Sequence, residues 1–283
     1  MNGGSHAAAD ERVNNPCPSS HRGFRGLMTT YTRKWFDQQV VGAASSASTV
    51  VPLVMDLVHP RSVVDVGCGM GVWLAEFIRA GVQDVLGLDG DYIDRGHLAI
   101  PTDKFRVCDL RQPLPADRKF DLAVSLEVAE HLPPGVAEQF VAGLAALAPV
   151  VLFSAAIPAQ PGNQHINTQW QSYWAGLFAA RGYAALDPIR PAVWNDPRVE
   201  WWYSQNTLMY VSRERLASDE RLSRLVVPAG SGMLDAVHPA LHEATSARAA
   251  RPGKYFVRQQ VTLVKKAIRS LVPGGGGGGG GGP

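Results

Sequence analysis

The chain has 283 residues, 46% of them hydrophobic and 18% charged, so it can bury a sizeable core and is not disordered as a whole. It shows no apolar signal segment, and no apolar run approaches the roughly 18 residues that a membrane span needs, which predicts a cytoplasmic protein. Its three cysteines (Cys17, Cys68 and Cys108) provide neither a disulfide framework nor a paired-cysteine zinc site, as expected in a reducing compartment.

The net charge of +2 is unevenly distributed along the chain. Seven basic residues and no acidic residue lie from Arg248 onward, which leaves 20 basic against 25 acidic residues in the preceding part. The pattern indicates an acidic body followed by a basic C-terminal segment.

In chain order, residues 1–25 are polar and small, and we expect them to be disordered. Residues 27–57 have helical apolar spacing, and Pro60 ends that helix. Seven short apolar runs then predict strands at 62–66, 84–89, 104–108, 120–126, 149–155, 183–187 and 206–212. Helices are predicted at 71–80, 135–147 and 168–181, whereas the Trp-rich stretch 192–206 is predicted to be irregular. This alternation is typical of a parallel sheet that helices cover on both faces.

The C-terminal part has an amphipathic pattern over 254–272, followed by an oligoglycine run. For the basic segment 248–272 three interpretations stay open: a helix that docks on the domain or forms a homodimer, a peripheral membrane or anionic glycolipid contact, and a nucleic-acid contact. The last is disfavoured because no RNA-binding signature is present. We divide the chain into a disordered N-terminus (1–25), one α/β domain (26–215), a helical basic extension (216–272) and a flexible tail (273–283).

The turn after the first strand contains Asp65-x-Gly67-x-Gly69-x-Gly71. Three glycines allow the backbone to approach a ligand closely, and the N–H groups of the following helix favour an anionic group. The dinucleotide fingerprint G-x-G-x-x-G needs a glycine at 72 or 74, where Val72 and Leu74 stand. An NAD-type oxidoreductase is therefore disfavoured; a purely structural turn is the other alternative.

The D-x-G-x-G-x-G spacing resembles motif I of the class I S-adenosylmethionine (SAM)-dependent methyltransferases, and segment 120–132 resembles the family's fourth strand and following turn. The resemblance implies a Rossmann-like, doubly wound sheet of seven strands in the order 3-2-1-4-5-7-6 with strand seven antiparallel. It also implies the cofactor-binding residues: Asp65, Gly67, Gly69 and Gly71 for the methionine end of SAM, Asp89 for the ribose, and Asp109 with the backbone N–H of Leu110 for the adenine.

On the acceptor side, Glu127, Glu130 and His131 form E-x-x-E-H, and we expect them to share one face of a helical turn. With His165 they resemble the Mg²⁺ site of the small-RNA 2′-O-methyltransferases and the quinone-biosynthesis O-methyltransferases; the alternative is that the segment only orients loops. His165 is the candidate general base, against the alternative of an ordinary loop histidine. His131 supports it or binds substrate.

Aromatic residues are frequent near this region. Those at helical spacing (Trp170, Tyr173, Trp174 and Phe178) are expected in the core, whereas those in 192–206 either stack on an acceptor or form a lid. The pattern up to residue 212 resembles a bacterial subgroup associated with glycan or secondary-metabolite assembly, which implies O-methylation of a sugar or small molecule. The alternatives are a Mg²⁺-assisted RNA or quinone-type O-methyltransferase, an oxidoreductase and a non-catalytic SAM-binding partner subunit; N- and C-methylation also stay open.

Overall fold

The computed structural model describes residues 33–249. The predictions for the N-terminal 25 residues, the amphipathic helix 254–272 and the oligoglycine tail lie outside this range. Residues up to His238 belong to one compact unit, and helix α9 (Pro239–Ala249) belongs to a second.

The first unit is built on one seven-stranded sheet with the order β3-β2-β1-β4-β5-β7-β6. The strands are β1 (Ser62–Val66), β2 (Asp84–Asp89), β3 (Phe105–Val107), β4 (Leu122–Leu126), β5 (Val150–Ser154), β6 (Tyr183–Leu186) and β7 (Leu208–Ser212). Strand β7 runs antiparallel to both β5 and β6, and the other neighbouring pairs are parallel. The predicted sheet order and the antiparallel last strand are confirmed.

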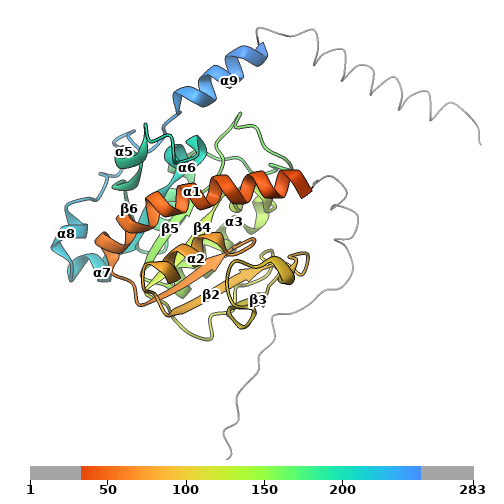
Figure 1. Cartoon of the computed structure of the whole chain (residues 1–283). Helices are drawn as coiled ribbons and strands as arrows, with labels where there is room; N and C mark the ends of the chain where they lie inside the picture. The colour runs from red at the N-terminus through yellow and green to blue at the C-terminus, as the bar shows by residue number, and fades with distance from the viewer. Residues whose placement is uncertain (1–32, 250–283) are drawn as a thin grey trace, which may run out of the picture. The chain divides into compact units, whose positions relative to one another are not determined.

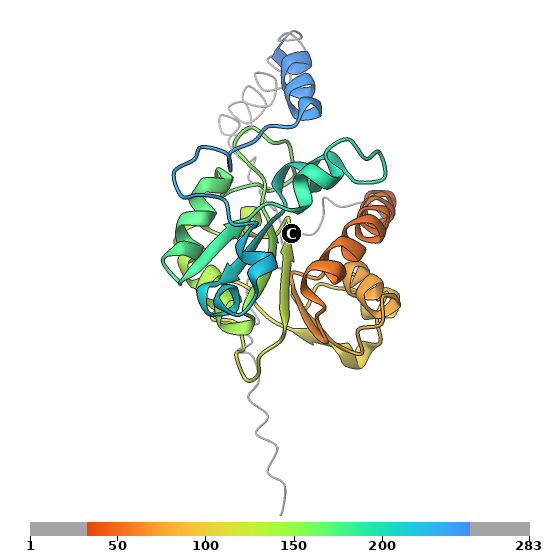
Figure 2. The same ribbon diagram turned by 90° about the vertical axis from the view of Figure 1, so that its left-hand side faces the viewer.

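Helices cover both faces of this sheet (Figures 1 and 2). Alternate strand residues point to opposite faces, so Val63 belongs to one core cluster and Val64 to the other. The first cluster includes residues of α1 (Arg33–Val58), α2 (Val72–Arg79) and α5 (Ile189–Val193), and the second those of α3 (Ala137–Leu147) and α4 (Gln171–Ala179). The carboxyl ends of the parallel strands therefore form one edge between two helical layers.

Helix α1 contains a segment, Val41–Val58, that is apolar and long enough to cross a membrane by length and composition. This corrects the expectation that no apolar run has that length. Its buried apolar residues Ala47, Val50, Val51, Val54 and Val58 recur at helical spacing and all belong to the first core cluster. Packing against the sheet therefore accounts for this apolar stripe.

The Trp-rich stretch before β7 is partly helical, contrary to the expectation of an irregular segment. It ends in α6 (Trp201–Asn206), and the residues just before α6 hydrogen-bond to α1. The Ser45 hydroxyl donates to the Arg198 carbonyl at 2.7 Å, and the Glu200 N–H donates to the Ser46 hydroxyl at 3.0 Å. These contacts between residues about 150 positions apart fix the segment against α1.

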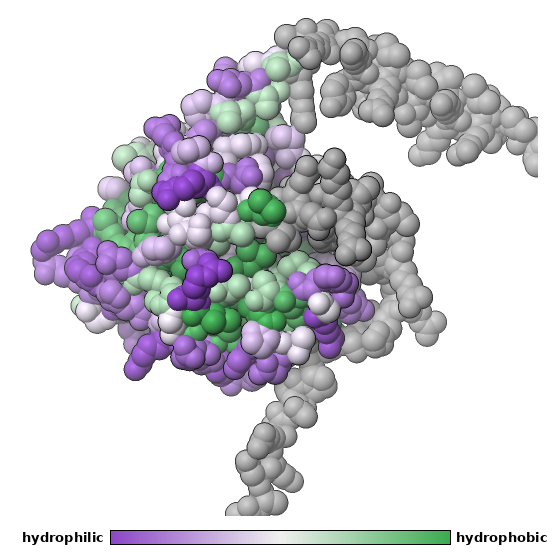
Figure 3. Space-filling model, viewed as in Figure 1, coloured by the Kyte–Doolittle hydropathy of each residue, from purple (hydrophilic) through white to green (hydrophobic). Residues whose placement is uncertain are grey.

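The chain after β7 returns to the edge of the sheet. After α7 (Arg213–Ala217) and α8 (Glu220–Ser223), the N–H of Val227 donates to the carbonyl of Ala185 on β6 at 2.9 Å, beside an antiparallel bridge between Leu186 and Val226. Hydrophilic residues dominate the surface where Figure 1 draws α7 and α8, whereas the rest of the same face mixes apolar and polar residues (Figure 3). Short 3₁₀ helices lie in the loops: η2 (Arg95–His97), η3 (Thr102–Lys104), η4 (Ala129–His131) and η5 (Pro134–Val136).

Replacement of Pro52, which lies exposed inside α1, is expected to stabilise the unit. Pro52→Ala restores an N–H that can donate to the Ser48 carbonyl one turn earlier, and the free energy of unfolding should rise by about 1–2 kcal/mol. Thermal or urea denaturation measures the change. Ser48→Ala, on the same exposed stretch, is the matched control and should shift stability by less than about 0.5 kcal/mol. An unchanged or lower stability of Pro52→Ala would contradict the prediction.

Candidate functional site

The glycine-rich turn after β1 has a left-handed backbone at each of its three glycines. The φ angles are +85° at Gly67, +53° at Gly69 and +77° at Gly71. A Cβ at Gly67 would overlap the methyl groups of Val128, and one at Gly71 would lie 2.9 Å from Ile100 Cγ1. A Cβ at Gly69 would meet nothing within 4 Å. Packing therefore requires the outer two glycines, and the middle one borders open space where a ligand can approach.

Two buried aspartates, Asp65 and Asp89, flank this turn, each 3% exposed. One oxygen of Asp89 accepts from the Gly69 N–H at 2.7 Å; the other accepts from the Gly90 N–H at 2.6 Å and from the Tyr92 hydroxyl at 2.5 Å. Burial raises the pKa of both carboxyls, and the charge of Asp89 raises the pKa of Asp65 further. Donated hydrogen bonds offset part of the shift at Asp89.

Tyr92 is a site residue that the sequence did not indicate. Its ring lies so close over Gly90 that a Cβ at this glycine would overlap it. The only available signal was its position three residues after Asp89.

Asp109 follows β3 and is paired with Arg111 in a two-pronged ion pair. The guanidinium donates through Nε at 2.8 Å and Nη2 at 2.7 Å, and the Arg111 N–H also donates to Asp109. The hydrogen bonds from Arg111 lower the pKa of Asp109, so this carboxylate is ionised. The next residue, Leu110, packs its side chain into the second core cluster.

Glu127 does not share a helical turn with Glu130 and His131, contrary to the expectation from E-x-x-E-H. It follows β4 with a φ of +56°, and only Ala129–His131 form a 3₁₀ turn. Its carboxylate accepts from Gln160 Nε2 and from Asn206 Nδ2, both at 3.0 Å. Burial raises the pKa of Glu127, and the hydrogen bond from Asn206 is the largest of the contributions that lower it.

Glu130, His131 and His165 do come together. One ligand atom from each lies within 4.8 Å of the others, and the two imidazole rings are 5.0 Å apart with edge-to-face geometry. The Glu130 carboxyl is fully buried, and among the described residues neither of its oxygens has a hydrogen-bond partner. Burial and the charge of Glu127 raise the pKa of Glu130 well above its ordinary value. The donor set of one carboxylate and two imidazoles fits a divalent transition metal better than Mg²⁺.

The loop after β5 contains His165 and also makes hydrogen bonds to the turn that carries His131. The N–H groups of Ile166 and Asn167 donate to the Glu130 carbonyl at 2.9 and 3.0 Å, and the His131 ring nitrogen Nδ1 lies 3.3 Å from the Gln164 carbonyl. His165 lies over Gly162, where a Cβ would overlap its ring. Desolvation lowers the pKa of both imidazoles, and the neighbouring His131 lowers that of His165 further.

Three apolar residues that follow His165 in the chain are exposed. Ile166, Trp170 and Tyr173 have exposed fractions of 57%, 42% and 37%, whereas Trp174 and Phe178 are buried. The expectation that the aromatic residues of this helix belong to the core is thus confirmed only for the second pair. Across the site, Tyr203 of α6 contacts the Trp73 ring edge-on, with ring centroids 5.2 Å apart.

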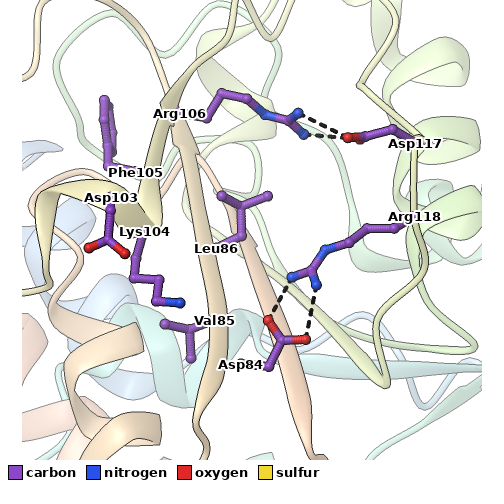
Figure 4. Close-up of a pocket in the computed structure, with 9 residues that line it drawn as sticks. All are labelled: Asp84, Val85, Leu86, Asp103, Lys104, Phe105, Arg106, Asp117 and Arg118. Atoms are coloured by element: carbon purple, nitrogen blue, oxygen red, sulfur yellow. Dashed lines mark hydrogen bonds and ion pairs between the residues drawn. The ribbon is translucent and has the colours of Figure 1, made fainter. Parts of the chain in front are cut away.

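A cavity of about 460 Å³ lies elsewhere, at the amino end of β2 (Figure 4). Its lining includes two ion pairs, Arg106 with Asp117 and Arg118 with Asp84. The lining reaches along β2 to Leu86, three residues or about 10 Å before Asp89, so the cavity does not include the end of the strand at the glycine-rich turn.

A family model described as a methyltransferase domain matches residues 45–187. Among solved structures, the chain is similar to magnesium protoporphyrin IX methyltransferase (ChlM) from Synechocystis PCC 6803 with bound SAH, at 20% identity over 64% of this chain and 88% of that chain, with a TM-score of 0.46. It is also similar to DesVI from Streptomyces venezuelae, at 17% identity over 62% of this chain and 96% of that chain, with a TM-score of 0.46. No curated protein sequence matches the chain.

The sheet order and the glycine-rich turn after β1 are those of a Rossmann-like class I methyltransferase. With the family match, the chain belongs to the SAM-dependent methyltransferases. SAM is therefore its cofactor, and the oxidoreductase alternative is excluded.

Two substitutions in the glycine-rich turn separate packing from backbone strain. Gly67→Ala places a methyl group against Val128 at a positive φ and should lower the free energy of unfolding by about 2–4 kcal/mol. Gly69→Ala meets no neighbour and should lower it by only about 1 kcal/mol. Thermal melting of both variants measures the difference, and equal destabilisation would contradict it.

SAM should stabilise the protein more as the pH rises. The pKa values of Asp65 and Asp89 are raised in the ligand-free fold, so their neutral forms contribute to its stability. This contribution to stability is lost as the pH rises through the raised pKa values. Binding of the cationic cofactor favours the ionised carboxylates instead. The increase in melting temperature on adding SAM should therefore grow as the pH rises above the ordinary aspartate pKa of about 4. A constant or shrinking increase would show that these carboxyls do not titrate with binding.

Proposed function

We propose that the protein methylates a hydroxyl group on a sugar or a secondary-metabolite-type small molecule, with His165 as general base. The observation that carries this proposal is the place of His165 in the loop after β5, at the sheet edge that bears the glycine-rich turn, with a lowered pKa and with exposed apolar residues following it in the chain. Methyl transfer is an in-line displacement for which the cofactor supplies the leaving group. The protein has to align the acceptor and take up its proton.

We assign the cofactor as follows. Asp65 and the three glycines bind the methionine end of SAM. Asp89 binds the ribose hydroxyls; it already accepts three hydrogen bonds, so the Tyr92 hydroxyl has to give way to two new donors. Asp109 accepts from the adenine amino group while keeping its pair with Arg111, and the Leu110 N–H donates to a ring nitrogen.

His165 takes the acceptor proton, and His131 supports it or contacts the substrate. The lowered pKa of His165 leaves the neutral, proton-accepting form in excess at neutral pH. Ile166, Trp170 and Tyr173 offer apolar surface for the carbon face of a sugar or for a planar ring.

A metal-assisted reaction is a second candidate, supported by the grouping of Glu130, His131 and His165. These three residues would hold a divalent ion, which when bound would lower the pKa of the acceptor hydroxyl. Glu130 would then lose its proton, and His165 would be a ligand in place of a base.

For partners and location, we propose a small-molecule acceptor and a cytoplasmic protein. The two cysteines of the described region, Cys68 and Cys108, are free and buried, as expected under reducing conditions. A homodimer or a membrane contact would involve residues 254–272, which lie outside the described part of the chain.

Acceptors should be screened with labelled SAM, first on hydroxylated sugars and aromatic small molecules. His165→Ala should lower kcat by about 10²–10⁴-fold and change SAM affinity less than about twofold. His97→Ala, which removes an exposed histidine of η2, is the matched control and should leave kcat unchanged. The acid limb of the kcat–pH profile should lie below the ordinary imidazole pKa of about 6.5 and vanish in His165→Ala.

The same assay distinguishes the two candidates. Turnover that survives EDTA supports His165 as base, whereas turnover that EDTA abolishes and Mn²⁺ or Mg²⁺ restores supports the metal. Full activity of His165→Ala would exclude both roles. A protein that binds SAM and methylates no acceptor would favour a partner subunit without activity of its own.

A further inference from the structure

Four carboxyl groups gather where β1, β2 and β4 end: Asp65, Asp89 and Glu130, which are buried, and Glu127, which is half-buried. Among residues 41–247, none of them forms an ion pair with lysine, arginine or histidine. Buried carboxylates need an opposite charge or strong hydrogen bonds to stay ionised. These carboxyl groups therefore have no positive charge beside them to balance their ionised forms, and a positively charged ligand can supply it.

Glu127 differs from the other three because amide side chains hold it in place from two sides. Gln160 and Asn206 donate to its two oxygens. The side-chain oxygen Oε1 of Gln160 in turn accepts from Gln205 Nε2 at 3.0 Å and from Asn206 Nδ2 at 2.9 Å. The side-chain oxygen Oδ1 of Asn206 accepts from Gln205 Nε2 at 2.9 Å. The three amides are at most 7% exposed. Such a closed network fixes the position of the carboxylate, and its hydrogen bonds offset part of the cost of a charge there.

The network places Glu127 beside the glycine-rich turn. Its neighbour Val128 packs directly against Gly67. Burial raises the pKa of the Tyr203 hydroxyl, and the charges of Glu127 and Asp65 raise it further. Strands β1 and β4 are parallel neighbours, so Glu127 and Asp65 lie on the same edge of the sheet, next to the glycine-rich turn.

We propose that Glu127 is the electrostatic partner of the positively charged sulfur of SAM and makes the site prefer SAM to its product. This inference rests on the cofactor assignment proposed above. In the transfer, the sulfur–methyl bond breaks as the acceptor oxygen–methyl bond forms, the bonding electron pair stays on sulfur, and the acceptor proton goes to the base. The sulfur of SAM is thus cationic and that of the product, SAH, is neutral. A fixed carboxylate at this edge of the sheet attracts the first and not the second, which favours product release.

Metal binding is a poorer explanation for Glu127. Both of its oxygens already accept amide hydrogen bonds, and the residues that can converge on an ion are Glu130, His131 and His165. The backbone of Glu127 has a φ of +56° and lies outside the 3₁₀ turn of η4, so Glu127 is not part of the turn that carries Glu130 and His131.

Calorimetry with three ligands tests the proposal: SAM, SAH, and the SAM analogue in which an amine-bearing carbon replaces the methylated sulfur. Glu127→Gln should weaken SAM and the amine analogue by about tenfold and SAH by less than about threefold. Glu138→Gln, which removes one exposed carboxylate from α3, is the matched control and should change none of the three. Equal weakening of all three ligands by Glu127→Gln, or of none, would overturn the proposal.

Two further measurements do not depend on the folding of Glu127→Gln. Gln160→Ala, a change in a positioning residue, should lower the ratio of SAM to SAH affinity by about threefold. The unaltered protein should bind the amine analogue about tenfold more tightly than SAH, and equal or weaker binding of the analogue would contradict the proposal. A protein that binds none of the ligands would overturn the cofactor assignment itself, which is a different result from binding all three without preference.

Discussion

The hydrogen bond from the Gly69 N–H to the Asp89 carboxylate joins the turn after β1 to the end of β2, and the cofactor side of the molecule depends on it. It requires a left-handed backbone at Gly69 and a carboxylate that accepts hydrogen bonds while almost fully buried. The turn is held from its other side by Val128, which fills the space above Gly67. Three neighbouring strands thereby end in one rigid arrangement, which a ligand meets already formed.

The acceptor side is organised by a different interaction. Amide side chains from the β5–α4 loop and from α6 converge on Glu127, so elements far apart in the chain share one buried network. Of the four non-glycine residues with positive φ in the described range, Glu127, Ala159 and Gln164 lie in the loops that follow β4 and β5. Backbone strain concentrates at sites that the surrounding structure holds in place, and here the network supplies that support.

Local patterns in the sequence were enough to predict the strands, the turn after β1 and the position of Asp89 at the end of its strand, and the resemblance to a family supplied the sheet order. They failed for Glu127, because hydrogen bonds from residues 33 and 79 positions away set its conformation and override the helical spacing of E-x-x-E-H. Tyr92 was missed because a tyrosine that donates to a buried carboxylate has the same sequence appearance as any loop tyrosine. The apolar length of α1 was underestimated because interspersed small residues break its pattern without breaking its helix.

The two edges of the sheet are both poor sites for intermolecular strand addition. On one side, Val226 forms an isolated antiparallel bridge with Leu186 of β6 and the Val227 N–H donates to the Ala185 carbonyl, so this part of the edge is covered. On the other, β3 is only three residues long, and its Arg106 is engaged by Asp117. Short, charged or covered edges protect a sheet from pairing with another chain. If this domain associates with a second copy or another protein, helix faces or loops would provide the contact, and the sheet would keep its seven strands.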